Sequence, residues 1–460
     1  MYDEYRASYL RAREDMISKL PDSLLCQILS YLPTKDTIRT SVLSHRWKSV
    51  CLLVPSLDLS SSEFPAYDTF VSFIDKLLSF SREENSVLYK LKLSLQRDKN
   101  DQRCVTRWID FVATPKLKHL DVECVLANRI FLEVIQQSLY SICDTLVYLR
   151  LHQLSLGDFE SVSFPCLKTM RLEHNVYADD TSLESFISSS PVLEDLSIVR
   201  MVHDNVKVLR VISQTLTSFH VDYLYGEGDG FVDLFLREGS GVLIDAPRLK
   251  YLKFEDDLSE SKIITNAVSL EKVNVAFVFG DTDFAGVVDL PKRNMVRDFF
   301  NSISEVREMK ISLYTMEFLD YNRQHESYDP LPQFCNVSTL KVTFSVSNLD
   351  MMMPTLLESF PNLKSLVLKL DYDSLRKRAA DVRLSSVPPC LLSSLDFVKI
   401  KCFNGGPVNM EVARYFLENS QVLKKLVLDF KCSAFEQGFY MLRDLLALPR
   451  RSSSCQILLC

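Results

Sequence analysis

The chain has 460 residues, of which 47% are hydrophobic and 25% charged, so it can form several domains or one long repeat array with a large core. Its formal net charge of −7 argues against a nucleic-acid-binding protein, because such proteins usually carry a basic binding surface. The charged N-terminal stretch has no apolar signal region, and no apolar run approaches the roughly 18 residues of a membrane span. We therefore expect neither a nucleic-acid partner nor a membrane partner.

The twelve cysteines are scattered among apolar residues, and no two have CxxC spacing. This pattern is typical of buried free thiols in a reducing compartment, so we expect the cytoplasm and/or the nucleus. The glycine-rich stretch 226–230 (GEGDG) matches neither the G-x-G-x-x-G fingerprint nor the Walker phosphate loop. Because no nucleophile, metal or cofactor signature stands out, we predict a non-catalytic protein with no metal and no cofactor.

A small helical module is predicted over residues 16–53, after an N-terminal tail at 1–15. In the stretch LPDSLLCQILSYLP, Pro21 suits the start of a helix, and Asp22 or Ser23 can cap it. The apolar side chains of this stretch cover an arc of about 160°, wider than the stripe of about 100° typical of a surface helix.

Two further short helices are expected, with Thr34 and Ser44 as their caps. Three helices in so short a segment cannot build a self-sufficient core. The module must therefore pack against the rest of the chain or against another protein.

From residue 54 onward, the pattern apolar-x-x-apolar-x-apolar recurs in fourteen copies with a mean period of about 28 residues. The copies begin at Val54, Leu88, Leu117, Leu146, Leu167, Leu193, Leu216, Leu249, Leu270, Val306, Val337, Leu363, Leu395 and Leu423. The last two apolar residues of each copy lie on one face of a short strand, and the chain can return through a helix or an irregular loop. This spacing predicts an α/β fold: an irregular leucine-rich-repeat solenoid with a parallel β-sheet on its concave face.

The strand positions between the apolar residues are expected to face the concave surface, where they could bind a target protein. An ordinary solvated strand face is the alternative at each position. The candidates are His119, Asp121, Tyr148, Arg150, His152, Arg171, Glu173, His220, Tyr251 and Lys253.

Residues 20–47 resemble the F-box, whose pattern runs as LP..L...IL.YLP..D..R.S.LS.RW. The matching residues are Leu20, Pro21, Leu24, Ile28, Leu29, Tyr31, Leu32, Pro33, Asp36, Arg39, Ser41, Leu43, Ser44, Arg46 and Trp47. The stretch Ser385 to Phe430 resembles the FBD domain through the pieces VP.CLLSSL, A.Y.LEN and VLKKL. The whole chain thus resembles the plant F-box/FBD/LRR-repeat family, with leucine-rich repeats at 54–380 and an FBD domain with terminal repeats at 381–460.

The resemblance implies a substrate receptor of an SCF-type ubiquitin ligase, whose F-box packs against the Skp adaptor and thereby reaches cullin and RING. The repeats and the FBD region would then hold a target protein, which no short motif identifies. A hormone-like small-molecule co-receptor and a non-ligase interaction scaffold are the alternatives.

The family pattern also implies which residues contact the adaptor. They are Leu20, Pro21, Leu24, Leu25, Ile28, Leu29, Leu32, Pro33, Leu43 and Trp47. For Ile28, Leu43 and Trp47, packing inside the module is an equally open role. Several of the six apolar positions from Leu20 to Leu32 should remain exposed if a partner is to cover them.

Overall fold

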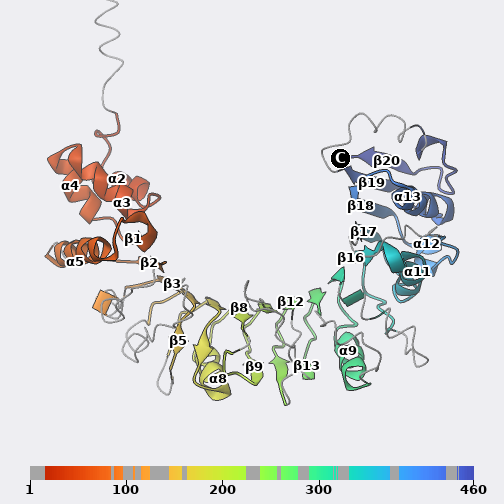
Figure 1. Cartoon of the computed structure of the whole chain (residues 1–460), viewed down its shortest axis with the longest axis horizontal. Helices are drawn as coiled ribbons and strands as arrows, with labels where there is room; N and C mark the ends of the chain where they lie inside the picture. The colour runs from red at the N-terminus through yellow and green to blue at the C-terminus, as the bar shows by residue number, and fades with distance from the viewer. Residues whose placement is uncertain are drawn as a thin grey trace, which may run out of the picture. The chain divides into compact units, whose positions relative to one another are not determined.

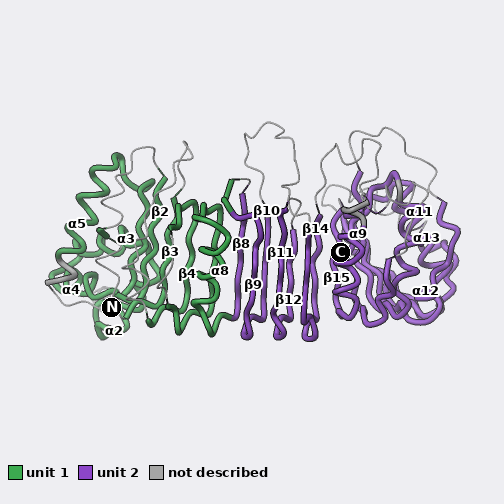
Figure 2. Tube along the Cα trace, turned by 90° about the horizontal axis from the view of Figure 1, so that it is seen from below, with its two compact units in different colours: residues 1–193, 203–205 green, residues 194–202, 206–460 purple. Residues whose placement is uncertain are grey.

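The computed structural model describes residues 16–83, 88–96, 107–108, 116–124, 144–157, 163–201, 203–223, 239–255, 261–277, 290–313, 315–316, 319, 331–372, 383–430, 443 and 445–460. The chain divides into two compact units (Figure 2): unit 1 comprises residues 1–193 and 203–205, and unit 2 comprises residues 194–202 and 206–460. The predicted tail at 1–15 and the glycine-rich stretch 226–230 lie outside the described residues.

Unit 1 begins with short helices that form the predicted helical module (Figure 1). They are α2 (Asp22–Leu29), α3 (Thr34–Arg39), the 3-10 helix η1 (Thr40–Val42) and α4 (His45–Leu52). Pro21 and Pro33 immediately precede α2 and α3. Ser44 caps α4 as predicted, since its Oγ accepts a hydrogen bond from the backbone N–H of Trp47 at 3.4 Å.

The other predicted caps were wrong, because α2 and α3 begin without a side-chain cap. Asp22, the first residue of α2, instead accepts a hydrogen bond from Arg46 Nε at 2.9 Å. Thr34 Oγ1 accepts a hydrogen bond from the backbone N–H of Asp58 at 2.7 Å. Both polar side chains therefore serve contacts with distant segments instead of the first turn of their own helix.

A parallel ladder follows the module in unit 1. Its strands are hydrogen-bonded in the order β1 (Ser56–Ser60), β2 (Lys90–Leu95), β3 (His119–Cys124), β4 (Tyr148–His152) and β6 (Thr169–Glu173). Buried apolar residues alternate with half-exposed polar ones, as period-two strand geometry requires. We call the sheet face that carries these half-exposed residues the open face.

Aligned apolar residues stack along this ladder and form its core. Leu91, Leu120 and Leu149 lie directly opposite one another in register and are at most 3% exposed. Unit 1 also contains the elements η2 (Ser61–Glu63), α5 (Tyr67–Glu83), β5 (Ser155–Leu156), β7 (Val176–Tyr177) and α8 (Asp180–Ser188).

Unit 2 contains a longer parallel ladder (Figure 1). Its strands are, in hydrogen-bonded order, β8 (Asp195–Arg200), β10 (Ser218–Tyr223), β12 (Tyr251–Glu255), β14 (Lys272–Ala276), β15 (Glu308–Ile311), β16 (Thr339–Ser345), β17 (Ser365–Asp371), β18 (Phe397–Phe403), β19 (Lys425–Phe430) and β20 (Gln456–Leu459). The helical segments of this unit are α9 (Leu290–Ser302), η4 (Val346–Asn348), α11 (Leu349–Glu358), α12 (Pro389–Ser393) and α13 (Pro407–Asn419).

Each of the fourteen sequence copies supplies one ladder strand, so the predicted parallel sheet of leucine-rich-repeat strands is confirmed. The predicted return through helices or irregular loops was wrong at two places. In unit 1, β5 and β7 pair as a separate two-stranded parallel sheet. In unit 2, β9 (Val208–Ile212), β11 (Gly241–Asp245) and β13 (Ser261–Thr265) form a separate three-stranded parallel sheet. The alternation of buried residues such as Leu209 and Val211 with half-exposed ones explains why these segments are strands.

Candidate interaction surfaces

Helix α2 has one buried apolar face and one exposed apolar face. Leu25 and Leu29, one turn apart, are 0% and 2% exposed, whereas Leu24 and Ile28, also one turn apart, are 45% and 46% exposed. The wide apolar arc of this helix is therefore split between an internal core and solvent.

The buried face belongs to a compact core within the helical module. Its members are Leu25, Leu29, Trp47, Val50, Cys51 and Val54, and Leu20, Cys26, Ile38 and Leu52 pack against them. The indole Nε1 of Trp47 donates a hydrogen bond to Ser18 Oγ at 3.1 Å. Burial raises the pKa of the Cys51 thiol, which keeps this core thiol protonated.

Arg46 fastens the start of the module to α4. Its guanidinium donates to Asp22 Oδ1, with the shorter N–O distance at 2.6 Å, and to the main-chain carbonyl oxygens of Ser18 and Leu20. These contacts position the chain that leads into α2, so the exposed face of this helix is held by a defined scaffold.

We refer to the exposed apolar residues of the module collectively as the apolar surface. They are Met16, Ile17, Leu24, Ile28, Tyr31, Leu32, Val42, Leu43 and Leu53. Tyr31 and Val42 are 82% and 85% exposed, far more than a residue that merely borders a core. Exposed apolar side chains gathered in so short a segment are typical of a site that another protein covers.

The ten residues assigned to adaptor contact divide into three groups. Pro21, Leu24, Ile28, Leu32, Pro33 and Leu43 are exposed, and Leu20 is half-buried. Leu25, Leu29 and Trp47 are buried in the core, so in this conformation they support the surface from beneath. Met16, Ile17, Tyr31, Val42 and Leu53 were not assigned, although Tyr31 already stood in the F-box match.

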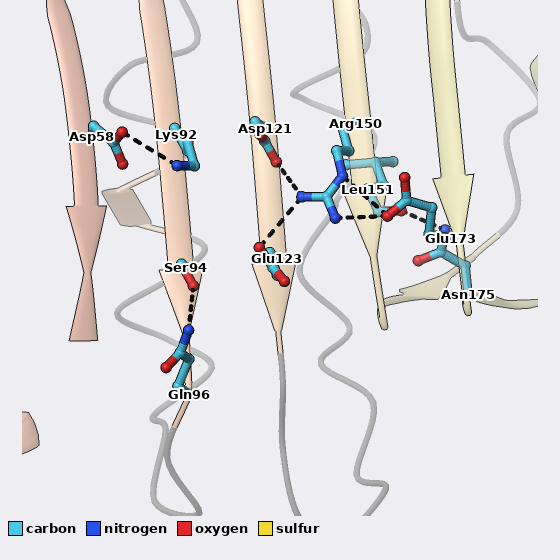
Figure 3. Close-up of polar contacts among 10 residues, drawn as sticks. All are labelled: Asp58, Lys92, Ser94, Gln96, Asp121, Glu123, Arg150, Leu151, Glu173 and Asn175. Atoms are coloured by element: carbon cyan, nitrogen blue, oxygen red, sulfur yellow. Dashed lines mark hydrogen bonds and ion pairs between the residues drawn. The ribbon is translucent and has the colours of Figure 1, made fainter. Parts of the chain in front are cut away.

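On the open face of unit 1, Arg150 lies at the centre of an ionic network (Figure 3). Its guanidinium contacts Asp121 at 3.1 Å, Glu123 at 3.3 Å and Glu173 at 2.6 Å. The Arg150 side chain is only 20% exposed, and neighbouring strands supply the three carboxylates. Predicted candidates Asp121, Arg150 and Glu173 thus come together, and Glu123 is a member that the sequence did not reveal.

Burial and ionic contacts compete within this network. Burial opposes ionisation of Glu173, but the Arg150 guanidinium outweighs it and holds the pKa of Glu173 below its ordinary value. At Asp121 burial prevails over Arg150, and the pKa of this carboxyl is raised. The network therefore favours the ionised form of Glu173 and disfavours that of Asp121.

The remaining unit 1 candidates lie on the same open face. The rings of His119 and Tyr148 stack with their centroids 5.7 Å apart. The rings of His152 and His174 pack edge to face with their centroids 5.3 Å apart. The pKa of His152 is lowered, mainly by burial and to a smaller extent by the neighbouring His174. Arg171 lies directly opposite Arg150 in the strand register.

In unit 2 we use the same name, open face, for the face of the ladder that carries its half-exposed residues. On this face, Lys253 lies at the centre of a second ionic cluster. Its ammonium lies 2.8 Å from His220 Nε2, 3.0 Å from Asp222 and 3.3 Å from Glu255. Burial and the adjacent Asp222 carboxylate raise the pKa of Glu255. The structure therefore joins predicted candidates His220 and Lys253 and adds two carboxylates that were not predicted.

The third unit 2 candidate, Tyr251, lies under the ammonium of Lys272, 5.8 Å from the ring centroid. Lysines continue along the open face beyond this point, on β15 to β19. The candidate list omitted them, although copies such as VREMKI and LDFVKI carry lysine between their last two apolar residues.

No group of three or more His, Cys, Asp or Glu side chains suited to hold a metal ion occurs within the described parts of the chain. The helices described there also lack the combination of length and apolar character that a membrane span requires.

Family models match three consecutive parts of the chain. The F-box domain model matches residues 17–58, and the FBD model matches residues 383–428. Between them, a model described as the LRR repeats of FBD-associated F-box protein At5g56370 matches residues 105–276.

Curated relatives from Arabidopsis thaliana are similar over nearly the full length. FBD-associated F-box protein At5g22730 is 62% identical over 455 residues, which cover 99% of this chain and 96% of the relative. Putative F-box/FBD/LRR-repeat protein At5g22610 is 52% identical over 459 residues, covering 97% and 89%. F-box/FBD/LRR-repeat protein At5g22700 is 42% identical over 450 residues, covering 97% and 98%. With its helical F-box, its ladder of repeat strands and its C-terminal FBD region, this chain belongs to the plant F-box/FBD/LRR-repeat family.

Proposed function

We propose that this chain is the substrate-recognition subunit of an SCF-type (Skp–cullin–F-box) ubiquitin ligase. An F-box domain implies in general the binding of a Skp-type adaptor, and F-box proteins with leucine-rich repeats are generally non-catalytic adaptors. The Skp adaptor links the chain to cullin and RING, and the repeat and FBD surfaces bind a target protein. The chain contributes effective concentration and positioning to ubiquitin transfer, while other subunits carry the bond chemistry.

The observation that carries this proposal is the apolar surface of the F-box. Leu24 and Ile28 are about half exposed although they share a short helix with fully buried leucines. Full burial of an exposed leucine or isoleucine contributes about 1.5–3 kcal/mol, and covering the exposed half of each of these side chains contributes about half of that, so several together suffice for a hot spot. A partner that binds this surface removes from water the apolar area that the isolated chain leaves exposed.

The test is capture of a purified Skp adaptor by the full chain and by Leu24→Glu/Ile28→Glu. Glutamate is a good helix former, so α2 should persist while its exposed face becomes charged. We expect adaptor recovery to fall by at least about tenfold, with an unchanged thermal unfolding transition.

A matched control is Ile212→Glu/Ile263→Glu, which charges two isoleucines of 46% and 48% exposure in unit 2. The control should capture the adaptor as well as the unaltered chain does. Equal recovery by the F-box variant and the control contradicts the assignment of the apolar surface to the adaptor.

The cellular abundance of the proteins that this chain binds distinguishes ligase function from scaffolding. Proteins that co-purify with the chain under proteasome inhibition should accumulate in cells when the chain is depleted. Unchanged abundance of every such protein favours the non-ligase scaffold. A hormone panel in a thermal-shift assay tests the small-molecule alternative, which predicts stabilisation by one compound.

We also place the protein in the cytoplasm and/or the nucleus. Nine cysteines within the described residues are free thiols, and burial raises the pKa of Cys124 and Cys390 to about 12. Free, protonated thiols suit a reducing compartment. A fluorescent fusion expressed in plant cells tests this placement, and signal in the secretory pathway contradicts it.

A further inference from the structure

Lysines dominate the open face of strands β14 to β19 in unit 2. Among the described residues of these strands, the lysines on this face are Lys272, Lys310, Lys341, Lys369, Lys399, Lys401 and Lys425. The carboxylates on the same face are Glu308, Asp371 and Asp429. We call this surface the lysine face. Its excess of positive charge contrasts with the net charge of −7 for the whole chain.

The strand register sets like charges directly against each other. Lys310 is the register partner of Lys341, and Lys369 is the register partner of Lys401. Neighbouring strands lie about 4.8 Å apart, and like charges placed directly opposite destabilise a sheet. The fold tolerates this repulsion on a face that a partner could neutralise.

Internal compensation of the lysine face is incomplete. Lys341 pairs with Glu308 at 2.5 Å, and Lys399 pairs with Asp429 at 2.9 Å. Lys310, Lys369 and Lys401 are exposed and form no ion pair with the part of the chain that the structure describes. On the open face of unit 1, by contrast, Arg150 is surrounded by three carboxylates of the same sheet.

We propose that the lysine face binds an acidic segment, rich in Asp and Glu, of a partner protein. The inference rests on the proposed function, for which it specifies the chemical class of the target segment. Alternate residues of one strand, such as Lys399 and Lys401, lie about 6.6 Å apart. Alternate carboxylates of an extended acidic peptide repeat at the same interval, so the two charge patterns can align.

The composition of the face favours carboxylates over phosphate groups and nucleic acid. Described residues of β14 to β19 include no arginine, the residue whose planar fork suits bidentate phosphate recognition. The net negative charge of the whole chain also opposes the approach of a polyanionic nucleic acid. A short acidic segment can contact the positively charged lysine face while most of the negatively charged surface of the chain stays far from it.

The test measures fluorescence anisotropy of a short labelled peptide of alternating Glu and Ser with the full chain bound to its Skp adaptor. A peptide of alternating Gln and Ser serves as the neutral probe. Binding of the acidic peptide should weaken as salt is added, because exposed charges are screened. The variant Lys310→Glu/Lys369→Glu/Lys401→Glu should bind the acidic peptide at least about tenfold more weakly.

A matched variant separates the lysine face from net charge. Lys116→Glu/Lys168→Glu/Lys250→Glu changes the total charge equally at exposed lysines outside the face and should bind the acidic peptide nearly as well as the unaltered chain. Circular dichroism melting checks that both variants fold. Equal affinity of the two variants, or no preference for the acidic over the neutral peptide, overturns the proposal.

Two competitors test the class of partner. A phosphoserine peptide or a single-stranded RNA that displaces the acidic peptide at lower concentration than unlabelled acidic peptide also overturns the proposal. Adaptor capture is measured on the same variants and should be unaffected by either lysine variant. The lysine-face proposal alone fails if the variant Lys310→Glu/Lys369→Glu/Lys401→Glu keeps its affinity for the acidic peptide while Leu24→Glu/Ile28→Glu loses adaptor capture. The proposed function alone fails if Leu24→Glu/Ile28→Glu captures the adaptor normally while the lysine variant loses peptide binding.

Discussion

Arg150 illustrates how single residues on the open face serve the fold. Its guanidinium contacts three carboxylates from neighbouring strands, and its side chain is 20% exposed. Ion pairs in such half-buried positions contribute more than fully exposed pairs, because solvent screens them less. Asp121, Arg150 and Glu173, which were predicted to contact a target, therefore have a structural role that target binding would have to share.

Glu173→Gln should lower the free energy of unfolding at pH 7 by about 1–2 kcal/mol, because it leaves part of the Arg150 charge uncompensated. The lowered pKa of Glu173 sets the pH window. Its contribution is complete above the ordinary glutamate pKa of about 4.3 and is lost as the pH falls through the lower value of the folded state.

Urea denaturation of both proteins at pH 7 and at decreasing acidic pH measures this effect. The difference between them should shrink once the pH falls below the ordinary glutamate pKa. Glu271→Gln, at an exposed position, provides the control and should change little. A difference that stays constant down to strongly acidic pH contradicts the assigned role of the Glu173 carboxylate.

Leu24 and Leu25 are adjacent leucines with opposite roles. Leu25→Ala should destabilise the F-box by about 2–5 kcal/mol, because it opens a cavity in a core where the side chain is 0% exposed. Leu24→Ala should change stability by about 0.5 kcal/mol or less and reduce adaptor affinity instead. Thermal unfolding together with adaptor capture measures both effects, and equal destabilisation by the two changes contradicts the division of the apolar arc.

The sequence indicated the apolar arc but could not divide it. Leu24 and Leu25 look alike in any helical pattern, and the division depends on Trp47 and Val50, which α4 brings against one side of α2. Capping was mispredicted at Asp22 for a related reason, since its partner Arg46 lies on a different helix. Contacts between segments that are distant in sequence leave no periodic signal.

At the scale of elements, the ladder strands were predictable because each carries two buried apolar residues at fixed spacing. The strands β9, β11 and β13 were not, because each is short and gains its partner only when three successive repeats stack. Strand β20 was missed for the same kind of reason: the sequence QILL carries no copy of the pattern, but β19 offers it a parallel edge.

The lysine pairs lead to a prediction about strand stability. Lys401→Glu places a carboxylate directly opposite Lys369 and should raise the free energy of unfolding by about 0.5 kcal/mol. The same change should weaken binding of the acidic peptide. Urea denaturation and anisotropy on one preparation test both, and a loss of stability contradicts the claim that Lys369 and Lys401 repel each other.

For the whole molecule, the order of F-box, repeats and FBD region could be predicted, and the family models match in that order. The division into two compact units near residues 193 and 194 could not. In a repeat array each repeat contacts mainly its neighbours, so the leucine pattern continues unchanged across such a boundary. The candidate target-binding residues stopped at Lys253, so they did not include the lysine face, which lies on later strands.

The central claim is that the apolar surface of the F-box is the adaptor site. Hydrogen–deuterium exchange of the full chain, measured with and without purified Skp adaptor, tests it most directly, because backbone amides report where the partner binds. We predict slower exchange on adaptor binding in peptides that cover α2, η1 and α4, with unchanged exchange on the strands of the lysine face. Protection confined to the repeat or FBD strands, with none in the F-box, would contradict the account.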